Sequence, residues 1–265
     1  MIKLLGLPYD GNSSFLKGPS LAPPRIRLVD KDGSANAAAE NGIDIIDGET
    51  YIDAGDITFN NCSPAEAFIR IKDAVIKQLA NGDKLLCFGG DHSVTYPVIE
   101  AFTNKYANLH ILHLDAHADL YGNFDDNPYS HASPFARIME QGKVRSLIQV
   151  GIRTLNAHQK QQAKKFGVSV IEMKNFSFDF IQHLQGPLYI SLDMDVLDPA
   201  FAPGISHHEP GGLSTRELLK ILQAIKVPVV GADIVEYNPT RDINNVTAMV
   251  ACKLFKELVA VMMQV

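Results

Sequence analysis

The segment Asp115-Ala116-His117-Ala118-Asp119 holds the densest group of reactive side chains in the sequence. Its two aspartates and its histidine alternate with alanine, so an extended backbone would point all three in the same direction. No basic residue lies near them in sequence to compensate their charge. Because burying two carboxylates and an imidazole without compensation is costly, the segment predicts a cation-binding site rather than a purely structural turn.

Three other segments carry residues of the same chemical kind. His92 follows two glycines, and Glu236 follows an apolar run. Asp193 and Asp195 form an Asp-x-Asp pair. Each of these is a weak signal alone, because glycines make tight turns and such aspartates often cap helices.

The four segments become informative when they are combined. They would bring together four carboxylates and two imidazoles, from Asp115, Asp119, Asp193, Asp195, His92 and His117. Four anions cannot share a small cavity unless they are protonated or cations lie between them, and two divalent ions would neutralise the set. Oxygen and imidazole ligands without thiolate favour Mn²⁺, with Fe, Co, Ni or Zn as alternatives. A water bridging two such ions loses its proton readily, which would provide a hydroxide nucleophile near neutral pH.

The reactive segments lie where short apolar runs end, and these runs alternate with amphipathic stretches. We predict strands at 2–7, 84–88, 109–114, 147–151, 168–172, 188–192 and 227–235, and helices at about 64–82, 94–103, 133–141, 157–165, 214–225 and 243–263. Strands linked by helices of this length form right-handed crossovers and a parallel sheet, and their apolar character indicates helices on both faces. In such sheets ligands bind at the carboxyl ends of the strands, where the reactive residues lie.

Length and charge limit the classes of function. The 265 residues include 24 Lys and Arg against 30 Asp and Glu, a net charge of −6, and the length fits a single domain over 1–265. An acidic chain without a long basic run argues against nucleic acid or an anionic membrane as a partner. Its three isolated cysteines indicate neither a disulfide framework nor a thiolate zinc site. Since no apolar stretch is long enough for a signal sequence or a membrane span, we expect a cytoplasmic protein.

Four segments together resemble the signature sequences of the arginase/agmatinase family, the ureohydrolases. They are GGDHS at 89–93, LDAHADLY at 114–121, SLDMDVLDPAFAPG at 191–204 and VEYNP at 235–239. The segment at 5–27 is also similar to the start of that family, so the resemblance covers nearly the whole chain. It implies an α/β fold, a three-layer α/β/α sandwich with a mainly parallel sheet, and a homo-oligomer, either a trimer or a hexamer.

The resemblance also implies a binuclear manganese site and a reaction, hydrolysis of a guanidinium C–N bond to urea and an amine. His92, Asp115, Asp119 and Asp193 would bind one ion, and Asp115, His117, Asp193 and Asp195 the other. Glu236 would accept hydrogen bonds from the guanidinium. His131, twelve residues after Asp119, would pass a proton to the departing amine, which suits a side chain that titrates near neutral pH.

The expected substrate is a small guanidino compound, with agmatine favoured. Arginases place an aspartate that meets the α-amino group in the loop after 151–153, where this chain has Asn156. Arginine would then lose a charge-assisted contact worth on the order of 1.5–3 kcal/mol. The segment PGISHHEP at 203–210 also departs from the family's Gly-Thr-Gly-Thr-Pro sequence, and it places His207 and His208 near the mouth of the pocket.

Other activities are alternatives to agmatine hydrolysis. They are arginase itself, guanidinobutyrase, and formiminoglutamase, which acts on a formimino compound. A non-catalytic metal-binding homologue is more remote. Loss of a metal ligand, of Glu236 or of His131 would mark it, and all of these residues are present.

Overall fold

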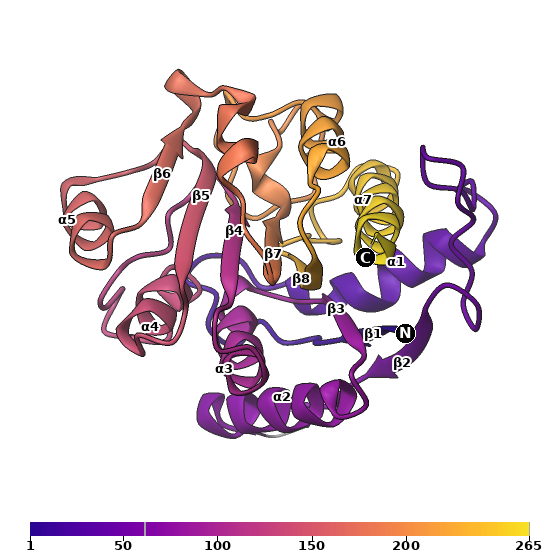
Figure 1. Ribbon diagram of the computed structural model, residues 1–265, viewed down its shortest axis with the longest axis horizontal. Coiled ribbons are helices and arrows are strands. Elements are labelled where there is room, and N and C mark those ends of the chain that lie inside the picture. Colours follow the sequence, from indigo (N-terminus) through magenta and orange to yellow (C-terminus); the bar gives the residue numbers. More distant parts are fainter. Residues whose placement is uncertain (61, 265) are drawn as a thin grey trace.

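The protein is built around an eight-stranded parallel sheet (Figure 1), in a computed structural model that describes residues 1–60 and 62–264. The strands are β1 (Ile2–Gly6), β2 (Ile52–Asp56), β3 (Lys84–Phe88), β4 (His110–Leu114), β5 (Ser146–Ile152), β6 (Ser169–Glu172), β7 (Leu188–Asp193) and β8 (Val229–Val235). Their order across the sheet is β2-β1-β3-β8-β7-β4-β5-β6, and each neighbouring pair is parallel. The carboxyl ends of all the strands therefore lie along one edge.

Helices cover both faces of the sheet and complete three layers (Figure 1). One layer contains α1 (Ala22–Lys31), α6 (Thr215–Ala224) and α7 (Val246–Met263), and the other contains α2 (Pro64–Leu79), α3 (Thr95–Lys105), α4 (Pro134–Glu140) and α5 (Ala157–Phe166). Short 3-10 helices lie at Pro19–Leu21, His92–Val94, Met173–Asn175, Phe178–His183 and Met194–Val196. Neighbouring strand residues enter opposite layers: Leu85 packs with the α2–α5 layer and Leu86 with the other. The predicted α/β/α sandwich with a parallel sheet is confirmed.

Local sequence signals set several helix ends. α2 begins with a capping box, in which Ser63 and Glu66 each accept a hydrogen bond from the other's backbone N–H. α5 ends at Gly167, whose left-handed φ of 66° costs little without a Cβ. Within the described ranges, no helix is both long and apolar enough to cross a membrane.

Two elements fall outside the predicted set. α1 contains Pro23 and Pro24, which in sequence suggest a loop, but both lie in the first turn, where backbone N–H groups need no partner inside the helix. β2 has the sequence IDAGD, is only partly buried and lies at the sheet edge, so it lacks the apolar run that marks the other strands. Neither carries a predicted site residue.

The strands that precede the four reactive segments are neighbours at the centre of the sheet, in the order β3-β8-β7-β4. β3 leads to His92, β4 to Asp115, β7 ends at Asp193, and β8 leads to Glu236. Because the strands are parallel, these residues meet at the same edge of the sheet.

Candidate metal centre

One half of the candidate site surrounds the His92 imidazole. Its Nδ1 lies 3.2 Å from Oδ2 of Asp115 and 3.1 Å from Oδ2 of Asp119. The same nitrogen is 3.1 Å from Oδ2 of Asp193. All four side chains are buried. Three carboxylates thus point at one imidazole nitrogen.

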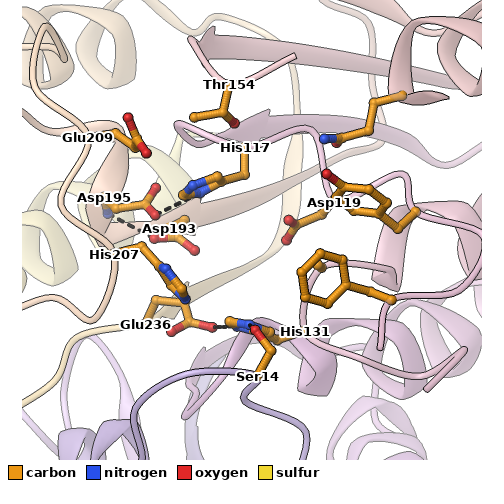
Figure 2. A pocket seen from close by; sticks show the side chains of 14 residues that line it. Ser14, His117, Asp119, His131, Thr154, Asp193, Asp195, His207, Glu209 and Glu236 are labelled. Carbon is orange, nitrogen blue, oxygen red and sulfur yellow. Dashed lines mark hydrogen bonds and ion pairs between the residues drawn. The ribbon is translucent and has the colours of Figure 1, made fainter. Parts of the chain in front are cut away.

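The other half surrounds His117 (Figure 2). Its Nδ1 lies 2.9 Å from Oδ2 of Asp195. The same nitrogen lies 3.4 Å from Oδ1 of Asp115. The backbone N–H groups of Ala116 and Asp195 donate to Asp195 Oδ1 and Asp193 Oδ1, at 3.0 and 2.8 Å, and fix both carboxylates. Asp115 contributes to both halves, so the structure brings all six predicted ligands into one cluster.

The hydrogen bonds around His92 fit a metal ligand. Its Nε2 is 3.0 Å from Ser191 Oγ, and Ser191 donates its hydroxyl to Asp233 Oδ1 at 2.7 Å. Because that hydroxyl proton is committed to a carboxylate, the hydroxyl oxygen accepts from the imidazole, and Nε2 carries the hydrogen. In the neutral imidazole Nδ1 then carries the lone pair. This nitrogen is buried, has no hydrogen-bond partner among the described residues and faces three carboxylates. Such an arrangement suits a cation held between the four groups.

The electrostatics of the cluster lead to the same requirement. Burial raises the pKa of the Asp193 carboxyl well above its ordinary value, and the carboxylates of Asp195 and Asp115 raise it further. Burial and the Asp115 carboxylate also raise the pKa of Asp119. Without cations the ionised form of both carboxyls is therefore disfavoured. Divalent ions compete with protons for these groups, so we expect metal affinity to increase with pH.

His113 orients the shared carboxylate of Asp115. Gln149 on β5 donates its side-chain N–H to His113 Nδ1 at 2.9 Å, which leaves Nε2 as the protonated nitrogen. That Nε2 donates to Asp115 Oδ2 at 2.7 Å. His110 has a different partner: its Nδ1 lies 2.7 Å from Oγ of Ser146, the first residue of β5. The sequence signal that could have indicated this role of His113 is its position two residues before Asp115 on an extended segment.

Asp233, in the middle of β8, is a supporting residue that the sequence analysis did not identify. It is fully buried and accepts from the hydroxyls of Ser191, Tyr189 and Thr95 at 2.7, 2.8 and 2.9 Å. Burial raises its pKa, and the nearby His92 imidazole and these hydroxyls act in the opposite direction. The only sequence signal was a single aspartate within an apolar strand.

Replacing Asp233 with Asn should weaken metal binding by about 10–100-fold, the usual cost of losing a partner that orients a ligand. The neutral amide accepts the Ser191 hydroxyl less strongly and leaves His92 less firmly oriented. Titration of Mn²⁺ into metal-free protein by calorimetry would measure the change. Thr95→Ser keeps a hydroxyl donor on Asp233 and is the matched control. Equal affinity in Asp233→Asn and wild-type protein would contradict this role.

His131 and Glu236 form a buried pair beside the cluster (Figure 2). Nδ1 of His131 lies 2.7 Å from Oε1 of Glu236, and Nε2 lies 2.8 Å from the hydroxyl of Ser14. Burial alone would lower the pKa of His131, but the Glu236 carboxylate raises it to about 9. Burial would raise the pKa of Glu236, but the His131 imidazolium outweighs it and lowers that pKa. At neutral pH the pair is therefore an imidazolium and a carboxylate.

Two of the predicted site residues have left-handed backbones. Asp119 has a φ of 49° and Glu236 a φ of 62°. Such conformations are uncommon for residues with a side chain, and they cluster at functional sites. Here they occur at residues whose carboxylates point into the cluster and the cavity beside it.

The structure gives Asn156 and the two rim histidines different positions. Asn156 caps α5, accepting from the Gln159 N–H at 2.9 Å, and it donates to the Tyr121 hydroxyl at 2.6 Å. It is not among the described residues that line the cavity beside the histidine and aspartate cluster. His207 lines that cavity, whereas His208 is exposed and bonds the Pro203 carbonyl at 2.8 Å.

A cavity of about 220 Å³ opens beside the histidine and aspartate cluster and is large enough for a small molecule. Its lining combines carboxylates, imidazoles, hydroxyls and two aromatic rings. The residues are Ser14, His117, Asp119, Tyr121, Phe124, His131, Ala132, Thr154, Gln159, Asp193, Asp195, His207, Glu209 and Glu236. Four of these residues have no role predicted from the sequence: Ser14, Thr154, Gln159 and Glu209.

Comparisons with known proteins agree with this geometry. Residues 1–260 match the model of the arginase family. The chain is 47% identical to Arginase 1, mitochondrial, of Arabidopsis thaliana, over 97% of this chain and 80% of that protein. An arginase structure from Medicago truncatula superimposes with a TM-score of 0.93 at 42% identity, covering 98% of this chain and 87% of that one. An agmatinase from Bacillus anthracis is 32% identical, over 97% and 90% of the two chains.

The fold and the histidine and aspartate cluster define a hydrolase with a site that could bind metal. More specifically, the chain belongs to the arginase family, whose members include the arginases and agmatinases that it matches. The predicted ureohydrolase resemblance is confirmed. The preference for agmatine is not supported, because the arginases are considerably more similar to this chain than the agmatinase is.

Proposed function

We propose that this protein hydrolyses L-arginine to urea and ornithine. The supporting observation is its 47% identity to an arginase along nearly the whole chain, against 32% to an agmatinase. The cavity beside the cluster is of a suitable size for one small guanidino compound, the substrate class expected from the sequence. Arginine thus replaces agmatine as the favoured substrate.

Two Mn²⁺ ions are the proposed cofactors. His92, Asp115, Asp119 and Asp193 would hold one ion, and Asp115, His117, Asp193 and Asp195 the other. The choice of metal rests on the donor set, which combines carboxylate oxygens with imidazole and contains no thiolate. When bound, such a pair of ions lowers the pKa of a water molecule, so that it can attack near neutral pH.

Glu236 is proposed to bind the guanidinium, and His131 to protonate the leaving amine. The Glu236 carboxylate accepts two described hydrogen bonds, one from the backbone N–H of His92 and one from Nδ1 of His131. Both are made to Oε1, which leaves Oε2 for a substrate. A histidine whose pKa is raised to about 9 is protonated at neutral pH and can donate. Ornithine would leave as the protonated amine.

The first experiment is a urea assay with Mn²⁺-reconstituted protein and five candidate substrates: arginine, agmatine, guanidinobutyrate, guanidinopropionate and formiminoglutamate. We expect rapid urea release from arginine and a lower kcat/KM for agmatine, in line with the chain's greater similarity to an arginase than to an agmatinase. Formamide and ammonia would be monitored for the formimino compound. Asp115→Asn protein, purified in the same way, controls for contaminating hydrolase. Faster turnover of agmatine would restore the agmatinase hypothesis, and no urea from any guanidino compound would reject both.

A further inference from the structure

Glu209 places a free carboxylate in the wall of the substrate cavity. The residue is half-buried and lies in the 203–210 loop, which the sequence marked as unusual for its histidines. Within the described chain, its carboxylate makes no hydrogen bond or ion pair. A charged group that lines a cavity and lacks a partner is available to a ligand.

The guanidinium of Arg153 contacts the backbone of Glu209 but does not bind its carboxylate. Arg153 donates to the backbone carbonyl of Glu209 from Nε at 2.8 Å and Nη2 at 2.6 Å, rather than to its carboxylate. Its remaining described hydrogen bonds go to other backbone carbonyls, including those of Gly151 and Asp195. Arg153 therefore fixes the backbone of the loop and leaves the Glu209 side chain uncompensated.

The other charges around the cavity already have partners. Asp119, Asp193 and Asp195 belong to the metal cluster, and Glu236 is paired with His131. None of the 14 described residues lining the cavity is Lys or Arg. Glu209 is thus the remaining carboxylate for which a ligand would have to supply the positive charge.

Figure 2 shows Glu209 and Glu236 on opposite sides of Asp193 and Asp195. A linear ligand with a guanidinium at Glu236 would need a second cationic group to neutralise Glu209. The other loop offers no such carboxylate, because Asn156 is neutral and is committed to capping α5. The α-ammonium of arginine supplies the required charge.

We propose that Glu209 binds the ammonium group at the end of the substrate remote from the guanidinium. It would make the site selective for guanidino compounds that carry this ammonium over those that carry only a carboxylate. This inference rests on the proposed ureohydrolase function and names the group that sets its specificity.

The test compares ornithine with 5-aminopentanoate, which differs only by lacking the α-amino group. Binding of each to Mn²⁺-reconstituted protein is measured by calorimetry. We expect wild-type protein to bind ornithine about tenfold more tightly and Glu209→Gln to lose most of that preference, since a charge-assisted hydrogen bond is removed. Glu49→Gln alters an exposed glutamate away from the cavity and should keep the wild-type preference. Metal content should be the same in all three proteins.

Turnover of arginine and of 4-guanidinobutanoate distinguishes a failure of the role proposed for Glu209 from a failure of the proposed ureohydrolase function. Glu209→Gln should lower kcat/KM for arginine about tenfold and leave that for 4-guanidinobutanoate unchanged or higher. Equal losses for both substrates, or equal binding of ornithine and 5-aminopentanoate by wild-type protein, would overturn the role of Glu209. A Glu209-dependent preference for ornithine in a protein that releases no urea would reject the proposed function alone.

Discussion

Replacing Asp115 with Asn is expected to remove most of the bound metal and to abolish measurable urea release. Asp115 faces both His92 and His117, so a neutral amide at this position weakens both halves of the cluster. It also removes the carboxylate that accepts from His113. Metal affinity should fall by more than about 100-fold, beyond the cost of losing an outer partner. Metal analysis after dialysis and the urea assay would measure the two effects.

A matched control for this substitution is Asp73→Asn, which makes the same chemical change on the exposed face of α2. It should retain metal and turnover at wild-type levels. Circular dichroism would establish that both variants are folded. Asp115→Asn protein with two ions per chain and unchanged turnover would show that Asp115 does not connect the two halves.

The convergence of the candidate metal ligands could be predicted because they follow short apolar runs, which the alternation with amphipathic stretches identifies as buried strands. His92, Asp115 and Asp193 all lie at strand ends, and parallel pairing places such ends together. The sequence does not contain the strand order, β3-β8-β7-β4. The hydrogen bonds that orient His92 depend on that order, because Ser191 on β7 and Asp233 on β8 are paired only through the register of these two strands. Residues that act across neighbouring strands could therefore not be predicted from one segment at a time.

The preference for agmatine had a specific physical origin. It rested partly on the likeness of the 120–130 loop to agmatinases and partly on Asn156, which was expected at the position of an ammonium-binding aspartate. In the structure Asn156 caps α5, and a free carboxylate, Glu209, lines the cavity from a different loop. Loop residues are far apart in sequence and take their positions from the strands that they connect. Charge complementarity in such a pocket can be judged only after the loops are placed.

Replacing His131 with Asn should lower kcat by about 10²–10⁴-fold, the range expected for loss of a general acid, while the protein keeps its metal. His131 makes its described side-chain hydrogen bonds to Glu236 and Ser14, which lie outside the predicted ligand set. Its pKa is raised to about 9, so the group that is lost is a proton donor at neutral pH. Urea release and metal content, measured on the same preparation, would separate catalysis from metal binding.

The pH profile adds a readout that a structural role for His131 would not produce. In wild-type protein kcat should fall as pH rises past the pKa of the imidazolium, because the proton donor is then lost. This alkaline limb of the pH profile should lie at or below about pH 9, since bound cations lower the pKa of a nearby imidazolium. The variant should lack the limb, and added imidazole should partly restore its rate if the vacated space admits a small acid. Full turnover in His131→Asn, or an identical alkaline limb in both proteins, would assign the proton transfer to another group.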